Sequence, residues 1–299
     1  MKLTPFHIDQ VVERALEEDL SAGDPTTDGL IPPDLMGRAL IVAKAHGVLA
    51  GTALAEAVWR RVDPAVAYTA LLPDGATLRP TDPGQGIEGD IIAEVEGPMA
   101  AILKGERTAL NFMQRLSGIA TETRRYVDAV APYPAVILDT RKTVPGLRTL
   151  DKYAVATGGG KNHRLNLGDG ILVKDNHIAA AATYGLTLGQ AIERLRETAP
   201  HAMKIEVEVE DLAQVDEALA ARAEILLLDN MSVDMMVEAV RLAKGRALTE
   251  ASGNITLENV VEVAATGIDM ISVGALTHSV KALDLSLDFG GGAHGAAHA

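Results

Sequence analysis

The residues best suited to chemistry follow a series of short apolar segments in the second half of the chain. The segments are AVILDTRK, GILVKDN, KIEVEVE, ILLLDN, ALTEASG and MISVG, and near their polar ends stand Asp139, Arg141, Lys174, Glu208, Asp229, Glu250 and Gly274. Helical patterns separate the segments, which predicts parallel strands whose carboxyl ends meet at one edge of a sheet. Because ligands bind at that edge, we expect a site lined by cations and carboxylates there. Capping of the following helix explains Asp229 and Asn230 as well, but not Arg141 or Lys174.

A local excess of positive charge sharpens this prediction. From Asp139 to His177 the chain has seven Lys or Arg and four Asp, although the net charge of the whole protein is −14. A basic region inside an acidic protein favours a small anionic ligand and repels long polyanions. Arg148 and Lys152, four positions apart, fit a solvated helix face better than a site.

Three glycine-containing loops are candidates for contact with the anion. The glycines at 158–160 precede His163 and Arg164, and such a run lets backbone approach a ligand, although it also suits the end of a helix expected over 147–157. Two later loops each follow a strand and open a helix, an arrangement whose N–H groups suit a phosphate. They consist of Ser252, Gly253 and Asn254, and of Gly274 and Ala275. An ordinary N-cap explains each loop singly, whereas two in succession favour a phosphate ligand.

Glu208 and Asp229 are predicted at neighbouring strand ends, where two carboxylates hold Mg²⁺ together with ligand phosphates. A barrel strand has no free face, so at least one of the alternating Glu206, Glu208 and Glu210 must enter the site. Because no His or Asp cluster has the spacing of metal ligands, we do not expect a metal cage made by protein alone.

The elements around these residues predict an α/β fold with two domains. Helices are expected over 7–20, 52–62, 186–198, 212–221, 233–243 and 257–265, and N-terminal strands over 38–45 and 65–72. A long helix after Pro98 is expected to break at Ser117–Gly118. We place the boundary there, with an α+β domain at 1–117 and a domain of repeated βα units at 118–276. The segment 277–299 is expected to return to the first domain or to be partly disordered, with His294 and His298 in a Gly/Ala tail.

Composition excludes several classes of protein. The 299 residues are 47% hydrophobic and only 3% aromatic, so Ala, Val, Ile and Leu must build the core. A net charge of −14 argues against binding to nucleic acid or to an anionic membrane. The sequence has no Cys, which excludes disulfides and a thiol nucleophile. Since no apolar run reaches the ~18 residues of a membrane span, we expect a soluble cytoplasmic protein.

Several stretches resemble one enzyme family over most of the chain. They are ALEEDLSAGDPTTD, ERTALNFMQRLSGIAT, DTRKTVPGLRTLDKYAVATGGGKNHRLNLGDGILVKDNHI, LLLDN, EASGNI and ISVGALTHS. Together they resemble the family of nicotinate-nucleotide pyrophosphorylase (carboxylating), or quinolinate phosphoribosyltransferase. The resemblance implies an incomplete parallel (β/α) barrel with an N-terminal α+β open sandwich domain, and a homodimer or hexamer. It implies that quinolinate and 5-phosphoribosyl-1-pyrophosphate give nicotinate mononucleotide, pyrophosphate and CO₂ with Mg²⁺, a step of NAD biosynthesis.

The resemblance also implies roles for individual residues. Arg107 in ERTALN resembles an arginine that reaches quinolinate from the neighbouring subunit. The dicarboxylate site is then formed by Arg141, Lys142, Thr143, His163, Arg164 and Lys174. Glu208 and Asp229 resemble the acids that face the ribose and the metal, and Lys174, Glu208 and Asp229 are the implied catalytic residues. The 5-phosphate loops are Ser252, Gly253 and Asn254, and Val273, Gly274 and Ala275.

Three alternatives stay open. A related phosphoribosyltransferase for nicotinate would tolerate loss of one arginine, whereas Arg107, Arg141 and Arg164 are all present. A barrel aldolase or lyase would use Lys174 as a Schiff-base nucleophile, against which its polar neighbours argue. A non-catalytic binding protein would bind ligand without turnover.

Overall fold

The computed structural model describes residues 2–80 and 89–289, so the predicted tail with His294 and His298 lies outside the described part. The chain forms two compact units. Of the described residues, the first unit comprises 2–80, 89–122, 144–159 and 279–289, and the second comprises 123–143 and 160–278. The boundary at 117/118, which rests on a helix break and not on contacts, stays a prediction.

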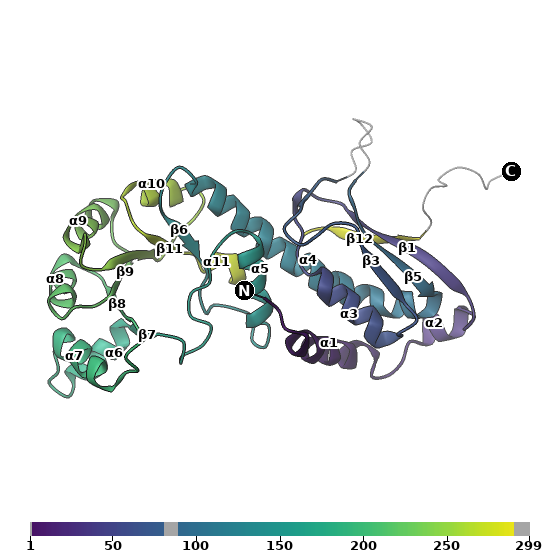
Figure 1. Ribbon diagram of the computed structural model, residues 1–299, viewed down its shortest axis with the longest axis horizontal. Helices are drawn as coiled ribbons and strands as arrows, with labels where there is room; N and C mark the ends of the chain where they lie inside the picture. Colours follow the sequence, from purple (N-terminus) through teal and green to yellow (C-terminus); the bar gives the residue numbers. More distant parts are fainter. Residues whose placement is uncertain (1, 81–88, 290–299) are drawn as a thin grey trace. The chain divides into compact units, whose positions relative to one another are not determined.

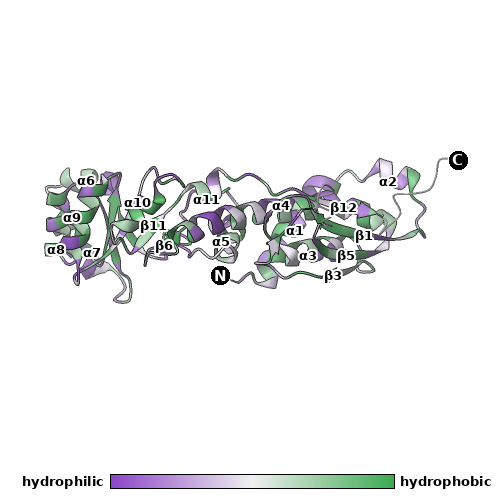
Figure 2. Ribbon diagram, turned by 90° about the horizontal axis from the view of Figure 1, so that it is seen from above, coloured by the Kyte–Doolittle hydropathy of each residue, from purple (hydrophilic) through white to green (hydrophobic). Residues whose placement is uncertain are grey.

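The first unit is built on an antiparallel sheet of order β12-β1-β5-β3. Its strands are β1 (Met36–Ala43), β3 (Ala67–Ala70), β5 (Ile91–Pro98) and β12 (Leu285–Phe289), beside a small pair of β2 (Gly47–Val48) and β4 (Thr77–Leu78). Its helices are α1 (Pro5–Leu20), α2 (Pro25–Leu30), α3 (Thr52–Val62), α5 (Arg148–Thr157) and part of α4. Helices α1 and α3 pack side by side (Figure 1). Ala39, Ile41 and Ala43 alternate toward the core, and β1 is largely coloured hydrophobic (Figure 2).

Helix α4 (Met99–Val130) is continuous, so the predicted break at Ser117–Gly118 is wrong. A Cβ on Gly118 would lie 2.3 Å from the carbonyl oxygen of Lys281, which shows that glycine is there because another backbone approaches the helix. The Ser117 hydroxyl accepts a hydrogen bond of 2.9 Å from the N–H of Ala50. Both residues serve packing within the first unit, which local propensity does not reveal.

The second unit is a six-stranded parallel sheet of order β6-β11-β10-β9-β8-β7. The strands are β6 (Val136–Leu138), β7 (Ile171–Val173), β8 (Ile205–Val209), β9 (Ile225–Asp229), β10 (Leu248–Ser252) and β11 (Met270–Ser272). The helices are α6 (Asp175–Ala182), α7 (Leu188–Thr198), α8 (Leu212–Ala220), α9 (Val233–Ala243), α10 (Val260–Ala265) and α11 (Ala275–His278). Helices α7, α8 and α9 pack in succession along the sheet (Figure 1). Among the described residues β6 and β7 are the two edges of the sheet, which therefore stays open.

All six strands predicted in the second half are present, and the mixed α/β fold class is confirmed. The five residues of β8 are all buried, so Glu206 and Glu208 are both enclosed, as a strand without a free face requires. The capping explanation for Asp229 and Asn230 is wrong. Helix α9 is capped by Ser232, whose hydroxyl accepts from the N–H of Met235 at 3.3 Å. The acid at the end of β9 is therefore available for another role.

Candidate active site

A cavity of about 570 Å³ lies in the second unit at the carboxyl ends of its strands. Its predicted lining residues are Arg141, Lys142, His163, Arg164, Lys174, Glu208, Asp229, Ser252, Gly253 and Asn254. The cavity is within the size range of small-molecule sites, and its lining is unusually polar for one. Ten of the fifteen predicted site residues therefore lie together at this edge of the sheet.

Five predicted residues lie outside this lining. Thr143 follows a tight turn in which its N–H donates to the carbonyl of Arg141 at 2.9 Å, and Thr140 lines the cavity in its place. Val273 is buried in the core, while Gly274 and Ala275 lie at the start of α11. Gly274 nevertheless borders the site, since a Cβ there would lie 3.1 Å from Cδ of Lys142. Arg107 lines a separate cavity of the first unit together with residues of α1.

The basic side of the cavity contains two arginines with unused donors. The Nε atoms of Arg141 and Arg164 are both buried and have no hydrogen-bond partner within the described protein. Arg164 is steadied by one bond from Nη1 to the carbonyl of Gly170 at 3.0 Å. Burial lowers the pKa of Arg164, and the positive charge of Arg141 acts in the same direction. Buried donors without partners are costly, so the geometry is prepared for an anion that accepts from both guanidinium groups.

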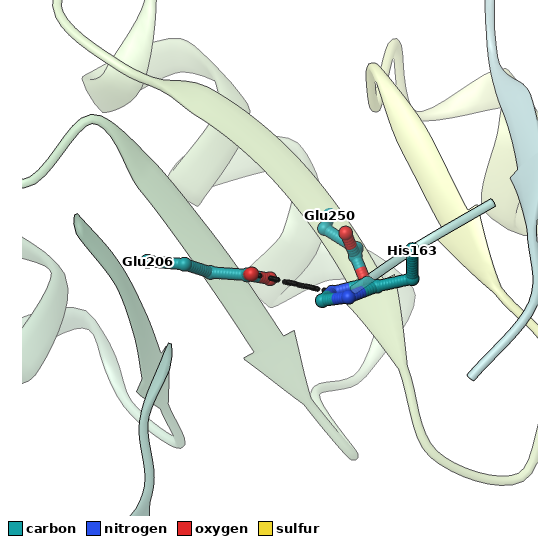
Figure 3. Close-up of side chains that lie close together, drawn as sticks. All are labelled: His163, Glu206 and Glu250. Carbon is teal, nitrogen blue, oxygen red and sulfur yellow. Dashed lines mark hydrogen bonds and ion pairs between the residues drawn. The ribbon is translucent and has the colours of Figure 1, made fainter. Parts of the chain in front are cut away.

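Beside them, His163 lies between two buried carboxylates (Figure 3). Its Nε2 is 3.2 Å from an oxygen of Glu206 and 3.6 Å from Oε1 of Glu250. Burial alone lowers the pKa of His163, but the two carboxylates outweigh it and the pKa is raised. Burial and the charge of Glu206 raise the pKa of Glu250 to about 7. Glu250 therefore changes its protonation near neutral pH beside the imidazole of His163.

His163, Glu206 and Glu250 each offer one ligand atom, and these atoms lie close enough together to hold a metal ion. In the neutral ring, the Nδ1 atom of His163 accepts a hydrogen bond of 2.6 Å from the N–H of Arg164, which places the single ring proton on Nε2. A metal needs the free electron pair of Nε2, which this tautomer does not offer. The cluster was not expected, because its members come from separate elements. In this tautomer it is a hydrogen-bonded network and not a metal centre.

Glu208 and Asp229 offer the hard oxygen ligands that suit Mg²⁺. Glu208 lies 3.4 Å from Nζ of Lys174, whose side chain is half exposed. This ion pair and exposure do not fit the apolar pocket that a Schiff-base lysine requires. Asp229 is half-buried and accepts from Nδ2 of Asn230 at 2.7 Å. Two carboxylates together with ligand phosphates form a donor set that fits Mg²⁺.

A fully buried acid, Asp139, organises the loop that carries His163. Its two oxygens accept from Nδ2 of Asn162 at 2.7 Å and from the N–H of His163 at 2.8 Å. Asp139 thus supports the site without lining it.

Glu250, expected at the polar edge of the sheet but given no role, lines the cavity. Sequence reasoning assigned no place in the site to five other lining residues, namely Thr140, Leu172, Leu227, Asn230 and Ser272. Asn230 and Ser272 lie at or next to strand ends, so treating every such position as a candidate would have found these two.

Taken together, a parallel sheet and a cation-rich cavity at its carboxyl edge define an α/β protein suited to small polyanions. The family model for the C-terminal domain of quinolinate phosphoribosyl transferase matches residues 119–288, and that for its N-terminal domain matches residues 24–117. The chain belongs to the quinolinate phosphoribosyl transferase family.

Similar proteins cover nearly the whole chain. A probable nicotinate-nucleotide pyrophosphorylase (carboxylating) of Synechocystis is 42% identical over 283 residues, which is 94% of this chain and 92% of the relative. One of Bacillus subtilis is 44% identical over 271 residues, covering 91% and 89%. The solved nicotinate-nucleotide pyrophosphorylase of Francisella tularensis has a TM-score of 0.88 and 36% identity, covering 97% and 98% of the two chains. Among the described residues no helix has both the length and the apolar character to cross a membrane.

Proposed function

We propose that this protein transfers the phosphoribosyl group of 5-phosphoribosyl-1-pyrophosphate to quinolinate and releases pyrophosphate and CO₂, giving nicotinate mononucleotide in NAD biosynthesis. The observation that carries the proposal is the pair of buried, unpartnered Nε donors on Arg141 and Arg164. Family membership and the anion-suited loop at Ser252–Asn254 support it.

In this proposal the two arginines bind the two carboxylates of quinolinate. A guanidinium donates two parallel hydrogen bonds to a carboxylate, which a lysine cannot do, so the pair fixes the plane of the ring. The ring nitrogen is thereby oriented toward the sugar carbon that it attacks. Lys142 and Lys174 add positive charge for the remaining carboxylate and phosphate oxygens. Loss of turnover in Lys174→Ala is expected, and normal turnover with normal quinolinate affinity would refute its role.

Glu208 and Asp229 are proposed to face the ribose and to hold Mg²⁺ through pyrophosphate and water. When bound, Mg²⁺ neutralises charge that develops on the leaving pyrophosphate. The two carboxylates stabilise positive charge at the sugar carbon as the bond to pyrophosphate breaks. After the ring nitrogen is alkylated, its positive charge stabilises the electron pair left on the ring carbon when the adjacent carboxylate departs as CO₂. A proton from water then bonds to that carbon, and the protein contributes placement.

The proposal includes a homo-oligomer, a dimer or hexamer, in which Arg107 of one subunit serves the site of another. The support for shared sites is the resemblance of the ERTALN motif, and the experiment is subunit mixing. Arg107→Ala and Lys174→Ala, each inactive alone, should regain partial activity when mixed. No recovery after confirmed subunit exchange would refute shared sites.

The proposal also places the enzyme in the cytoplasm, which the lack of Cys suits because that compartment is reducing. Cell fractionation followed by an activity assay tests this location. Recovery of the activity in a membrane or exported fraction would refute it.

Product analysis with quinolinate, 5-phosphoribosyl-1-pyrophosphate and Mg²⁺, beside the same mixture with nicotinate, tests the central reaction. We expect nicotinate mononucleotide and CO₂ from quinolinate only. Product from nicotinate alone would indicate instead a related phosphoribosyltransferase that acts on nicotinate. Product from neither would leave the Schiff-base and non-catalytic alternatives.

A further inference from the structure

Asn230 contacts two parts of the site at once. It directly follows β9 and lines the cavity. Its Nδ2 donates to Oδ2 of Asp229 at 2.7 Å, and its Oδ1 accepts from Nδ2 of Asn254 at 2.9 Å. Its backbone N–H donates to the carbonyl of Ser252 at 3.0 Å. One side chain therefore joins the acid at the end of β9 to the loop at the end of β10.

The orientation of this amide follows from hydrogen-bond chemistry. An ionised carboxylate can only accept, so the NH₂ group of Asn230 must face Asp229. Its carbonyl oxygen then faces Asn254, which must present its own NH₂ group. The hydrogen bonds to Asp229 and from Asn254 thus fix the orientation of both amides.

The loop is packed tightly against this amide. Gly253 has a φ of +90°, and a Cβ there would lie 2.2 Å from Oδ1 of Asn230. On the other side, Nδ2 of Asn259 donates to the carbonyl of Asn254 at 2.9 Å. The loop is therefore held from both sides and Asn230 has little freedom to shift.

We propose that Asn230 is a positioning residue that holds Asp229 and the Ser252–Asn254 loop as one unit. The inference rests on the proposed function, in which the acid faces the ribose and the loop binds the 5-phosphate. The spacing between these two groups of a sugar phosphate is then set before the ligand binds, which reduces the ordering that binding requires. Asn230 is predicted to affect the phosphoribosyl donor and to leave quinolinate binding almost unchanged.

The competing explanation is that Asn230 only shapes a turn. Its φ is 53°, a left-handed conformation that asparagine tolerates better than most residues. Glycine and aspartate tolerate the same conformation, so they separate the two explanations. Asn230→Gly removes both side-chain hydrogen bonds. Asn230→Asp keeps the shape but cannot donate, and it places a second carboxylate beside Asp229.

The experiment measures the KM and the calorimetric Kd for 5-phosphoribosyl-1-pyrophosphate, and the KM for quinolinate, in both variants. We expect Asn230→Gly to weaken donor binding about tenfold, because a hydrogen bond to a charged group is worth at least that factor. Asn230→Asp should weaken it further through repulsion. The KM for quinolinate should stay within about twofold, since its proposed ligands are not disturbed.

Arg222→Gly is the matched control, because Arg222 has a left-handed φ of 60° and lies outside the cavity lining. It should bind the donor normally. Melting temperatures show whether each variant folds, and Asn230→Asp, which is nearly isosteric, provides a test if the glycine variant does not. Normal donor binding in a folded Asn230→Asp would overturn the inference. A wild-type protein that neither binds nor uses the donor would instead refute the proposed function.

Discussion

Asp151 in the first unit and Glu250 in the second are both carboxylates with at most 1% exposure, but their partners differ. Asp151 accepts two hydrogen bonds from Arg115, at 3.0 and 2.9 Å, and one from the N–H of Val144 at 3.3 Å. Oε1 of Glu250 has no hydrogen bond, and Nε2 of His163 lies 3.6 Å away. The buried carboxylate of the first unit finds its partners within the protein, although burial outweighs them and raises the pKa of Asp151. In the second unit, charges and donors are left incompletely satisfied around a cavity, where a ligand can complete them.

Removal of Arg115 should have the largest effect on stability. Arg115→Met leaves Asp151 buried without its cation, and breaking a buried pair in this way costs about 3 to 5 kcal/mol. Urea unfolding of the variant measures the loss. Arg241→Met is the control, because its pair with Glu238 is exposed and is worth less than about 1 kcal/mol. Equal losses in the two variants would contradict the structural role of Asp151.

Glu250→Gln should stabilise the protein, whereas Arg115→Met should destabilise it. The pKa of Glu250 is about 7 in the folded protein and 4.5 is its ordinary value, so the unfolded chain loses this proton first as pH rises. Ionisation of Glu250 therefore destabilises the wild type between these pH values, and glutamine removes the effect. As pH rises from 4.5 to 7, the free energy of unfolding of the variant should increase relative to that of the wild type, by up to about 3 kcal/mol. Above pH 7 the difference between the two proteins should stay constant.

Urea unfolding at several pH values, run on both proteins, measures this gain. A difference that does not vary with pH would contradict the assignment of the proton to Glu250.

Arg141→Ala should leave stability nearly unchanged and impair activity. Its buried Nε has no protein partner to lose, whereas the proposed carboxylate partner of the substrate would be lost. We expect kcat/KM for quinolinate to fall about a hundredfold, the scale for truncating one side of a buried charged pair. Steady-state kinetics and melting temperature are the measurements. A variant with a much lower melting temperature but an unchanged kcat/KM would show that Arg141 supports stability and not substrate binding, contrary to the difference drawn between the two units.

Gly253→Ala should have the smallest effect on activity. It is compared with Gly245→Ala in the same unit. Both Gly253 and Gly245 have positive φ, but an added Cβ meets Asn230 at the first and open space at the second. Each alanine variant should lose about 1 kcal/mol from backbone strain, and Gly253→Ala should lose more because its Cβ has to displace Asn230. Only Gly253→Ala should also raise the KM for the phosphoribosyl donor, by several-fold. Equal KM values would show that the loop does not need the close packing.

The second half of the fold was more predictable than the first for a physical reason. Strands buried on both faces tend to be apolar runs, as β6, β7 and β9 are. The regular alternation with helices made β8, β10 and β11 recognisable as well, although β8 and β10 contain charged or polar residues. Strands β5 and β12 were missed. β12 pairs with β1, from which it is separated by most of the chain, and local pattern carries no signal of that pairing.

In the candidate site, too, some features could be predicted from the sequence and others could not. Arg141, Lys174 and Asp229 stand where apolar runs end, so their positions along the chain are enough to predict that they share one edge of the sheet. The contact of His163 with Glu206 and Glu250 depends on how three elements meet, which no spacing encodes. Thr140 lines the cavity and Thr143 does not, a difference set by one turn that the sequence does not reveal, and the role implied for Thr143 stays a prediction.

The most direct test of the central claim is calorimetric binding of quinolinate and nicotinate to the wild type and to Arg141→Ala. If Arg141 and Arg164, whose Nε donors are buried without a partner, each bind one carboxylate, quinolinate should bind the wild type at least about tenfold tighter than nicotinate. The preference should disappear in Arg141→Ala. Equal affinities in the wild type, or a preference that survives the substitution, would contradict the account.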